Sequence, residues 1–132
     1  MPSVLITGAS RGIGHAAAQA FAQAGWDLLL LSRSEAALQS LAAELTPTGR
    51  RVVYRACDLC DPEAIAPAVE QLLAQGLRPS VLINNAGAAY TGDLLAMTLE
   101  RWQWLLQLNL TSTFQMCAAV VPAMRGAGGL VI

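Results

Sequence analysis

The stretch that decides the fold is Val4-Leu5-Ile6-Thr7-Gly8-Ala9-Ser10-Arg11-Gly12-Ile13-Gly14. A short apolar run leads directly into a glycine-rich turn, and an alanine-rich segment follows it. We expect a buried strand, a tight turn at Gly8 and a helix that begins near Gly12, with Gly14 allowing close packing of helix on strand. Free N–H groups at such a helix N-terminus bind phosphate. The stretch therefore predicts a dinucleotide pyrophosphate site, whose candidate residues are Gly8, Ser10, Arg11, Gly12, Ile13 and Gly14.

The glycine spacing, Gly-x-x-x-Gly-x-Gly, is a weak signal by itself because ordinary turns also produce it. The strand before the loop and the helix after it favour a dinucleotide site. No Gly-Lys-Ser or Gly-Lys-Thr follows the loop, as a P-loop requires. A purely structural turn stays open as the alternative interpretation.

The composition describes one soluble globular domain, or part of one. The chain has 132 residues, of which 55% are hydrophobic and 13% charged, with a net charge of −1. No basic stripe is present for nucleic acid, and no apolar run reaches the ~18 residues that span a membrane. The start, Met1-Pro2-Ser3, has no signal-peptide character. We therefore expect a cytoplasmic protein with no nucleic-acid or membrane partner.

Cysteine and histidine give no strong metal or redox signal. Cys57 and Cys60 form a C-x-x-C, but only Cys117 remains besides them. Two buried thiols at a strand end are therefore a better interpretation than a redox pair or half of a zinc site. His15 is the sole histidine. We predict a solvated helix residue there, and no metal site, because a metal needs several convergent donors.

Strands and helical segments alternate along the rest of the chain. After the first strand, further strands are expected at Asp27–Leu31, Val52–Ala56, Val81–Ile83 and Leu130–Ile132. Helices are expected from near Gly12 to Ala24, at Ser34–Leu45, from Pro62 to Gly76 and from Leu99 towards Arg125. Asp61 and Thr98 are expected to cap the last two helices. This alternation predicts an α/β, Rossmann-type, doubly wound parallel sheet with helices on both faces. We treat residues 1–132 as a single domain, truncated at the fifth strand.

Arg33 follows the second strand, 19 positions after Gly14, where a dinucleotide fold meets the adenosine ribose. An acidic residue there favours NAD. The guanidinium instead offers a planar, permanently charged fork for a 2′-phosphate, and Ser32 lies beside it. The alternative is that Arg33 only caps a surface turn.

Four motifs together resemble those of the classical short-chain dehydrogenase/reductase family, especially the 3-oxoacyl-carrier-protein reductase type. They are Thr7-Gly8-Ala9-Ser10-Arg11-Gly12-Ile13-Gly14, Asp58-Leu59, Asn84-Asn85-Ala86-Gly87 and Asn109. The resemblance spans the whole chain, which corresponds to about the first half of a family member. It implies hydride transfer between a nicotinamide and a carbonyl or alcohol substrate, in a homodimer or homotetramer. Arg33 together with Arg11 implies NADP(H) ahead of NAD(H).

The resemblance also implies roles for residues at the later strand ends. Asp58 would meet the adenine amino group and Leu59 would back the ring. The segment Asn84-Asn85-Ala86-Gly87 would tie the central strands together and line the adenosine ribose. Asn109 would hold a water in the proton relay of a catalytic tetrad. From the residues alone, the alternative for Asp58 is an ordinary loop aspartate. The alternative for Asn109 is a solvated or internally satisfied polar residue.

The other members of that tetrad are a serine, a tyrosine and a lysine, which we expect beyond Ile132. Tyr54 and Tyr90 lack the Tyr-x-x-x-Lys context, and the sequence contains no lysine. The chain alone is therefore predicted to be inactive. A non-catalytic NADP(H)-binding or interaction module is the alternative, and a Rossmann methyltransferase is a weaker one because of Arg33.

Two further surfaces are left open by the sequence. Only Tyr90, Gly92 and Leu94 are candidates to border a substrate pocket. The last long helix carries more apolar side chains than one sheet face needs, namely Trp102, Trp104, Leu105, Leu108, Phe114 and Met116. These form either a helix-to-helix dimer interface or a surface covered by the rest of the family's fold.

Overall fold

The computed structural model describes residues 1–132, which build one five-stranded parallel sheet. The strand order is β3-β2-β1-β4-β5. The strands are β1 (Ser3–Thr7), β2 (Asp27–Ser32), β3 (Val52–Ala56), β4 (Val81–Ile83) and β5 (Leu130–Val131). The order reverses between β1 and β4, so the crevice at their carboxyl ends is the place where such sheets bind ligands. The doubly wound, Rossmann-type prediction is confirmed.

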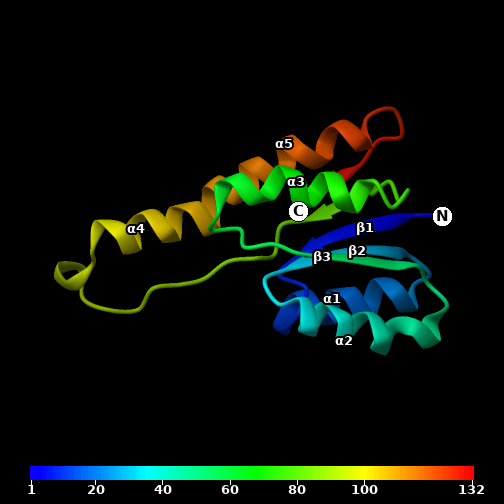
Figure 1. Ribbon diagram of the computed structural model, residues 1–132, viewed down its shortest axis with the longest axis horizontal. Helices are drawn as coiled ribbons and strands as arrows, with labels where there is room; N and C mark the ends of the chain where they lie inside the picture. Colours follow the sequence, from blue (N-terminus) through cyan, green and yellow to red (C-terminus); the bar gives the residue numbers. More distant parts are fainter.

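Helices lie on both faces of this sheet. They are α1 (Gly12–Gln23), α2 (Glu35–Leu45), α3 (Pro62–Leu73), α4 (Leu99–Leu106) and α5 (Ser112–Met124). Helices α1 and α2 lie on one side of the strands and α3 and α5 on the other, while α4 projects beyond the sheet (Figure 1). Short 3-10 turns occur at Thr46–Thr48 and Leu94–Ala96. None of the helices has the length and apolar character needed to cross a bilayer.

Strand β2 explains why its sequence shows no alternation. Its four consecutive leucines are all fully buried. Leu29 and Leu31 belong to the core under α3 and α5, whereas Leu28 and Leu30 belong to the core under α1 and α2. A strand that is covered on both faces has no polar side to present.

Side-chain caps start three of the helices, two of them at the predicted caps Asp61 and Thr98 and the third at Ser34, which was expected to be the first helical residue. Ser34 Oγ accepts from Ala37 N at 3.2 Å, Asp61 Oδ1 from Glu63 N at 3.1 Å, and Thr98 Oγ1 from Arg101 N at 3.1 Å. Each cap satisfies an N–H group that has no partner within its helix. Each of these three helix starts is therefore determined by residues within three positions of the cap.

The predicted continuous helix from Leu99 towards Arg125 is interrupted. A π-helical turn, η3 (Gln107–Thr111), separates α4 from α5, and Ser112 N donates to Gln107 O five residues back. Two side chains also bond to carbonyls one turn earlier: Asn109 Nδ2 to Leu105 O at 3.0 Å and Ser112 Oγ to Leu108 O at 2.7 Å. These bonds compete with the regular helical ladder and accompany its widening.

Candidate functional site

A cleft of about 820 Å³ lies at the carboxyl ends of the strands, where the sheet order reverses. Its lining includes eleven of the residues predicted for the site, which are Gly8, Ser10, Arg11, Gly12, Ile13, Ser32, Arg33, Leu59, Asn85, Ala86 and Gly87. It also includes six residues that the sequence analysis did not assign to a site, which are Ser34, Cys57, Cys60, Ala88, Trp104 and Leu108. The predicted residues from four separate segments thus converge on one cleft.

Two glycines of the first loop have left-handed backbone conformations. Gly8 has φ +63° and Gly12 has φ +58°, a region that other residues rarely adopt. A Cβ added at Gly8 would lie 3.0 Å from Ala86 Cα, whereas one added at Gly12 would meet nothing within 4 Å. The first glycine is therefore required by the protein's own packing. The second keeps space open at the N-terminus of α1.

Gly14 brings α1 against the loop. A Cβ at Gly14 would collide with Gly8 O and lie 2.6 Å from Asn85 Nδ2. That amide nitrogen donates to Thr7 O and Gly8 O, at 3.2 Å each. The close packing of Gly14 on Gly8 and the hydrogen bonds from Asn85 thus fix the conformation of the glycine loop.

Thr7 connects the two central strand ends, a role that the sequence analysis did not assign. Its Oγ1 accepts from Asn85 N and Ala86 N at 3.0 Å each and donates to Ile83 O at 3.4 Å. The signal in the sequence is a hydroxyl residue at the end of an otherwise apolar buried strand. Through Thr7, the glycine loop after β1 and the segment after β4 form one rigid wall.

The end of β2 places positive charge and an unpaired hydroxyl in the cleft. Arg33 is exposed, and the structure's single ion pair joins His15 to Glu44, so Arg33 and Arg11 have no carboxylate partner. Ser32 is 7% exposed, and its Oγ is buried without a hydrogen-bond partner. A buried polar group without a partner costs about 1–3 kcal/mol.

The two thiols of the C-x-x-C line the cleft as protonated groups. Burial raises the pKa of Cys57 to about 11, and the charges of Asp58 and Asp61 add to the rise. Burial followed by Asp58 also raises the pKa of Cys60, while Arg33 opposes this. Cys57 is buried as predicted, but Cys60 is only half-buried. Protonated thiols are weak nucleophiles and weak metal ligands.

Four predicted residues lie outside the lining. Gly14 is buried between the glycine loop and Asn85. The carboxylate of Asp58 accepts from Cys60 N at 2.9 Å within its own turn. Asn84 Nδ2 lies 3.7 Å from Cys117 Sγ, and its Oδ1 is buried without a partner.

The fourth of these residues, Asn109, lies in the π-helical turn and holds it against the segment after β4. Its Oδ1 accepts from Ala88 N at 3.0 Å and its Nδ2 donates to Ala88 O at 2.8 Å. A Cβ at Gly87 would lie 2.8 Å from the Asn109 Oδ1. The side-chain amide of Asn109 therefore has hydrogen-bond partners within the protein. Any contact of Asn109 with a ligand or water would involve its backbone.

The loop candidates for a substrate pocket do not reach the cleft. Tyr90, Gly92 and Leu94 are absent from its lining, and the Tyr90 hydroxyl donates to Asp93 O at 3.2 Å within the same loop.

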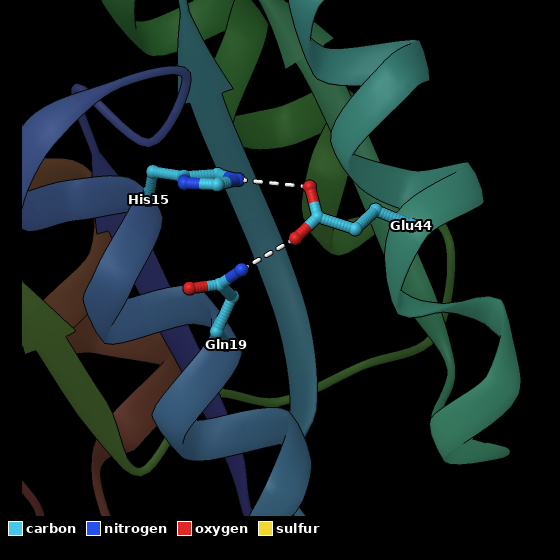
Figure 2. Close-up of polar contacts among 3 residues, drawn as sticks. All are labelled: His15, Gln19 and Glu44. Atoms are coloured by element: carbon cyan, nitrogen blue, oxygen red, sulfur yellow. Dashed lines mark hydrogen bonds and ion pairs between the residues drawn. The ribbon is translucent and has the colours of Figure 1, made fainter.

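His15 lies in α1 with its side chain 33% exposed, as a solvated helix residue should, and it also makes a contact that the sequence did not predict. Its Nε2 lies 3.0 Å from Glu44 Oε2, and Gln19 Nε2 donates to the other carboxylate oxygen (Figure 2). These two hydrogen bonds lower the pKa of Glu44, with that from His15 contributing most. The sequence gives no local signal for this contact because the partners are 29 positions apart on different helices.

Comparison with known proteins identifies the sequence family. The family model described as short chain dehydrogenase matches residues 2–132. A D-threitol dehydrogenase from Mycolicibacterium smegmatis is 36% identical over 127 residues, covering 95% of this chain and 48% of that protein. The chain spans about half the length of the curated relatives it matches.

Solved structures agree with this match. An alcohol dehydrogenase from Thermococcus sibiricus, complexed with 5-hydroxy-NADP, has a TM-score of 0.94 and 32% identity, covering 99% of this chain and 56% of that chain. A short-chain dehydrogenase from Sphingobium yanoikuyae, in complex with NADPH, has a TM-score of 0.89 and 40% identity, covering 99% of this chain and 52% of that one.

Proposed function

Because this chain belongs to the short-chain dehydrogenase family, we propose that it forms the NADP(H)-binding half of an oxidoreductase acting on a carbonyl or alcohol. The observation that carries the proposal is the end of β2. There Ser32, whose hydroxyl is buried without a hydrogen-bond partner, and Arg33, which has no carboxylate partner, follow one another in the sequence and both line the cleft. A 2′-phosphate supplies the charge and the hydrogen-bonding oxygens that this pair lacks.

The remaining cleft residues fit the other parts of the same cofactor. The open space above Gly12, at the N-terminus of α1, suits a pyrophosphate, and Arg11 adds a positive charge there. Leu59, with Asp58 beside it, suits the adenine ring. The wall of Asn85, Ala86 and Gly87 suits the ribose, with Asn84 anchoring that wall to β5 through Ile132 O, 2.7 Å from its backbone N.

NADP(H), when bound, supplies the hydride donor or acceptor of the reaction. The residues of this chain bind and orient it and exclude water from the cleft. Asn109 lies in a π-helical turn, where the widened ladder leaves backbone groups without their usual helical partners. We assign to its backbone the water-holding role in a proton relay with the family's serine, tyrosine and lysine, expected beyond Ile132.

The outer side of α4 and α5 supports self-association into a homodimer or homotetramer. Large apolar side chains recur every three or four positions and are 39–70% exposed, namely Leu99, Trp102, Leu106, Leu110 and Phe114. Trp102 and Phe114 were expected from the sequence, whereas three other residues expected there lie elsewhere: Met116 is fully buried in the core, and Trp104 and Leu108 line the cleft.

Calorimetric titration with NADPH and NADH tests the cofactor assignment. We expect NADPH to bind at least tenfold more tightly, because a charge-assisted contact contributes about 1.5–3 kcal/mol. Arg33→Ala should remove this preference and leave NADH binding unchanged. Arg125→Ala, a change of the same type far from the cleft, should have no effect. Equal affinity for both cofactors in the unmodified chain would disprove the 2′-phosphate contact.

Hydride transfer is tested separately, on the natural polypeptide that carries this domain. NADPH oxidation is followed by its absorbance in the presence of a panel of aldehydes and ketones. Turnover supports the oxidoreductase. Binding of NADPH without turnover of any substrate favours the non-catalytic binding module instead.

A further inference from the structure

Trp104 lines the cleft from α4, outside the loops that follow the strands. Leu108, four positions further along the helix, lines it too, so both side chains lie on the same side of the helix. Trp104 is half-buried, whereas Trp102 is 52% exposed and does not line the cleft. The chain therefore presents one indole of α4 to the cleft and the other to the outside.

One contact on the indole and one on the helical segment that follows it fix its position. The guanidinium of Arg101 lies 4.6 Å from the centroid of the Trp104 ring, in a cation–π contact. Gln107 Nε2 donates to Leu59 O at 3.1 Å, which fixes the helix against the loop after β3. The Trp104 indole thus lines the cleft in a fixed position.

The same contacts identify the end of the cleft at which the indole lies. Leu59 and Cys60 come from the loop that Gln107 holds, and both line the cleft. Cys57 N donates to Ser32 O at 2.8 Å, so the end of β2, which Arg33 follows, lies beside the same loop. Gln107 is three positions after Trp104 in the sequence, so Trp104 lies on the side of the cleft that Leu59 and Arg33 line.

We propose that Trp104 is a further cofactor-binding residue that forms the aromatic wall of the adenine pocket and contacts the base through its indole ring. The proposal rests on the proposed function, because Arg33 defines the adenosine end. Trp104, Leu108 and Leu59 offer the base an apolar surface. Stacking on an aromatic side chain suits any planar base, and Arg101 on the indole favours one ring orientation.

The test separates the two halves of the cofactor. Binding of 2′,5′-ADP and of reduced nicotinamide mononucleotide is measured by calorimetry on the unmodified chain, Trp104→Leu, Trp104→Phe and Trp102→Leu. We expect Trp104→Leu to weaken 2′,5′-ADP binding about tenfold and to leave the mononucleotide unaffected. Trp104→Phe should restore most of the affinity, and Trp102→Leu should match the unmodified chain.

Tryptophan fluorescence supplies a second readout that does not depend on the fold of Trp104→Leu. Addition of 2′,5′-ADP should quench the tryptophan fluorescence of the unmodified chain and of Trp102→Leu. It should not change the fluorescence of Trp104→Phe, in which only Trp26 and Trp102 remain. Unchanged affinity of Trp104→Leu, or quenching that persists in Trp104→Phe, overturns the proposal while the proposed function stands. Failure of the unmodified chain to bind 2′,5′-ADP overturns both.

Discussion

Gly12 and Gly14, two positions apart in the first loop, differ in what an added methyl group would meet. At Gly14 it would collide with Gly8 O and crowd Asn85, whereas at Gly12 it would meet no protein atom. We expect Gly14→Ala to lower the free energy of unfolding by about 1–3 kcal/mol through overpacking. Gly12→Ala should cost about 1–2 kcal/mol, through its positive φ alone.

Cofactor affinity separates the two variants further. The methyl group of Gly12→Ala would enter the space assigned to the pyrophosphate, so NADPH binding should fall far more than stability does. Urea unfolding and NADPH titration measure the two effects. A Gly12→Ala variant that binds NADPH normally would contradict the phosphate role of this loop.

Glu44 links two helices, and its effect on stability depends on pH. Hydrogen bonds from His15 and Gln19 lower the pKa of this carboxylate in the folded state. A carboxylate whose pKa is lowered by folding contributes stability at pH values above its ordinary pKa of 4.5. This contribution is lost as the pH falls through the pKa of the folded state. Glu44→Gln should therefore be less stable than the unmodified chain near neutral pH, and the difference should shrink under acid.

Urea unfolding across the acid range measures this difference. The effect is small because Glu44 is exposed to solvent. Glu70→Gln, on α3, removes a carboxylate from another helix and serves as the control. A Glu44→Gln difference that stays constant from neutral to acid pH would show that the carboxylate's charge is not involved.

The elements that the sequence predicts best are those set by neighbouring residues. Ser34, Asp61 and Thr98 cap helices within three positions of themselves, and the leucines of β2 reveal burial on both faces. The π-helical turn was not predicted because Asn109 is held there by Ala88, 21 positions away. Trp104 was assigned to a helix surface for the same reason: only the packed structure brings α4 to the loop containing Leu59.

At the scale of the whole molecule, the proposed self-association surface is the apolar outer side of α4 and α5, which does not line the cleft. Phe114→Asp places a charge on the outer apolar side, at a residue that is 70% exposed. We expect this change to shift the protein towards the monomer in sedimentation velocity, without loss of secondary structure. Gln39→Asp, which adds the same charge on α2, should leave the assembly unchanged. If Phe114→Asp sediments like the unmodified chain, this side is not the self-association surface.

Helix α4 contributes no fully buried residue, whereas α5 contributes Ser112, Met116, Val120 and Met124. The π-helical turn therefore joins an anchored helix to one whose order depends on its contacts, so local opening of α4 has a low free-energy cost. If a nucleotide binds against Trp104 and a second subunit against Trp102, as proposed, the two order the same short helix from opposite sides. The first to bind then reduces the ordering cost for the other, and thermodynamic linkage makes that cooperativity reciprocal.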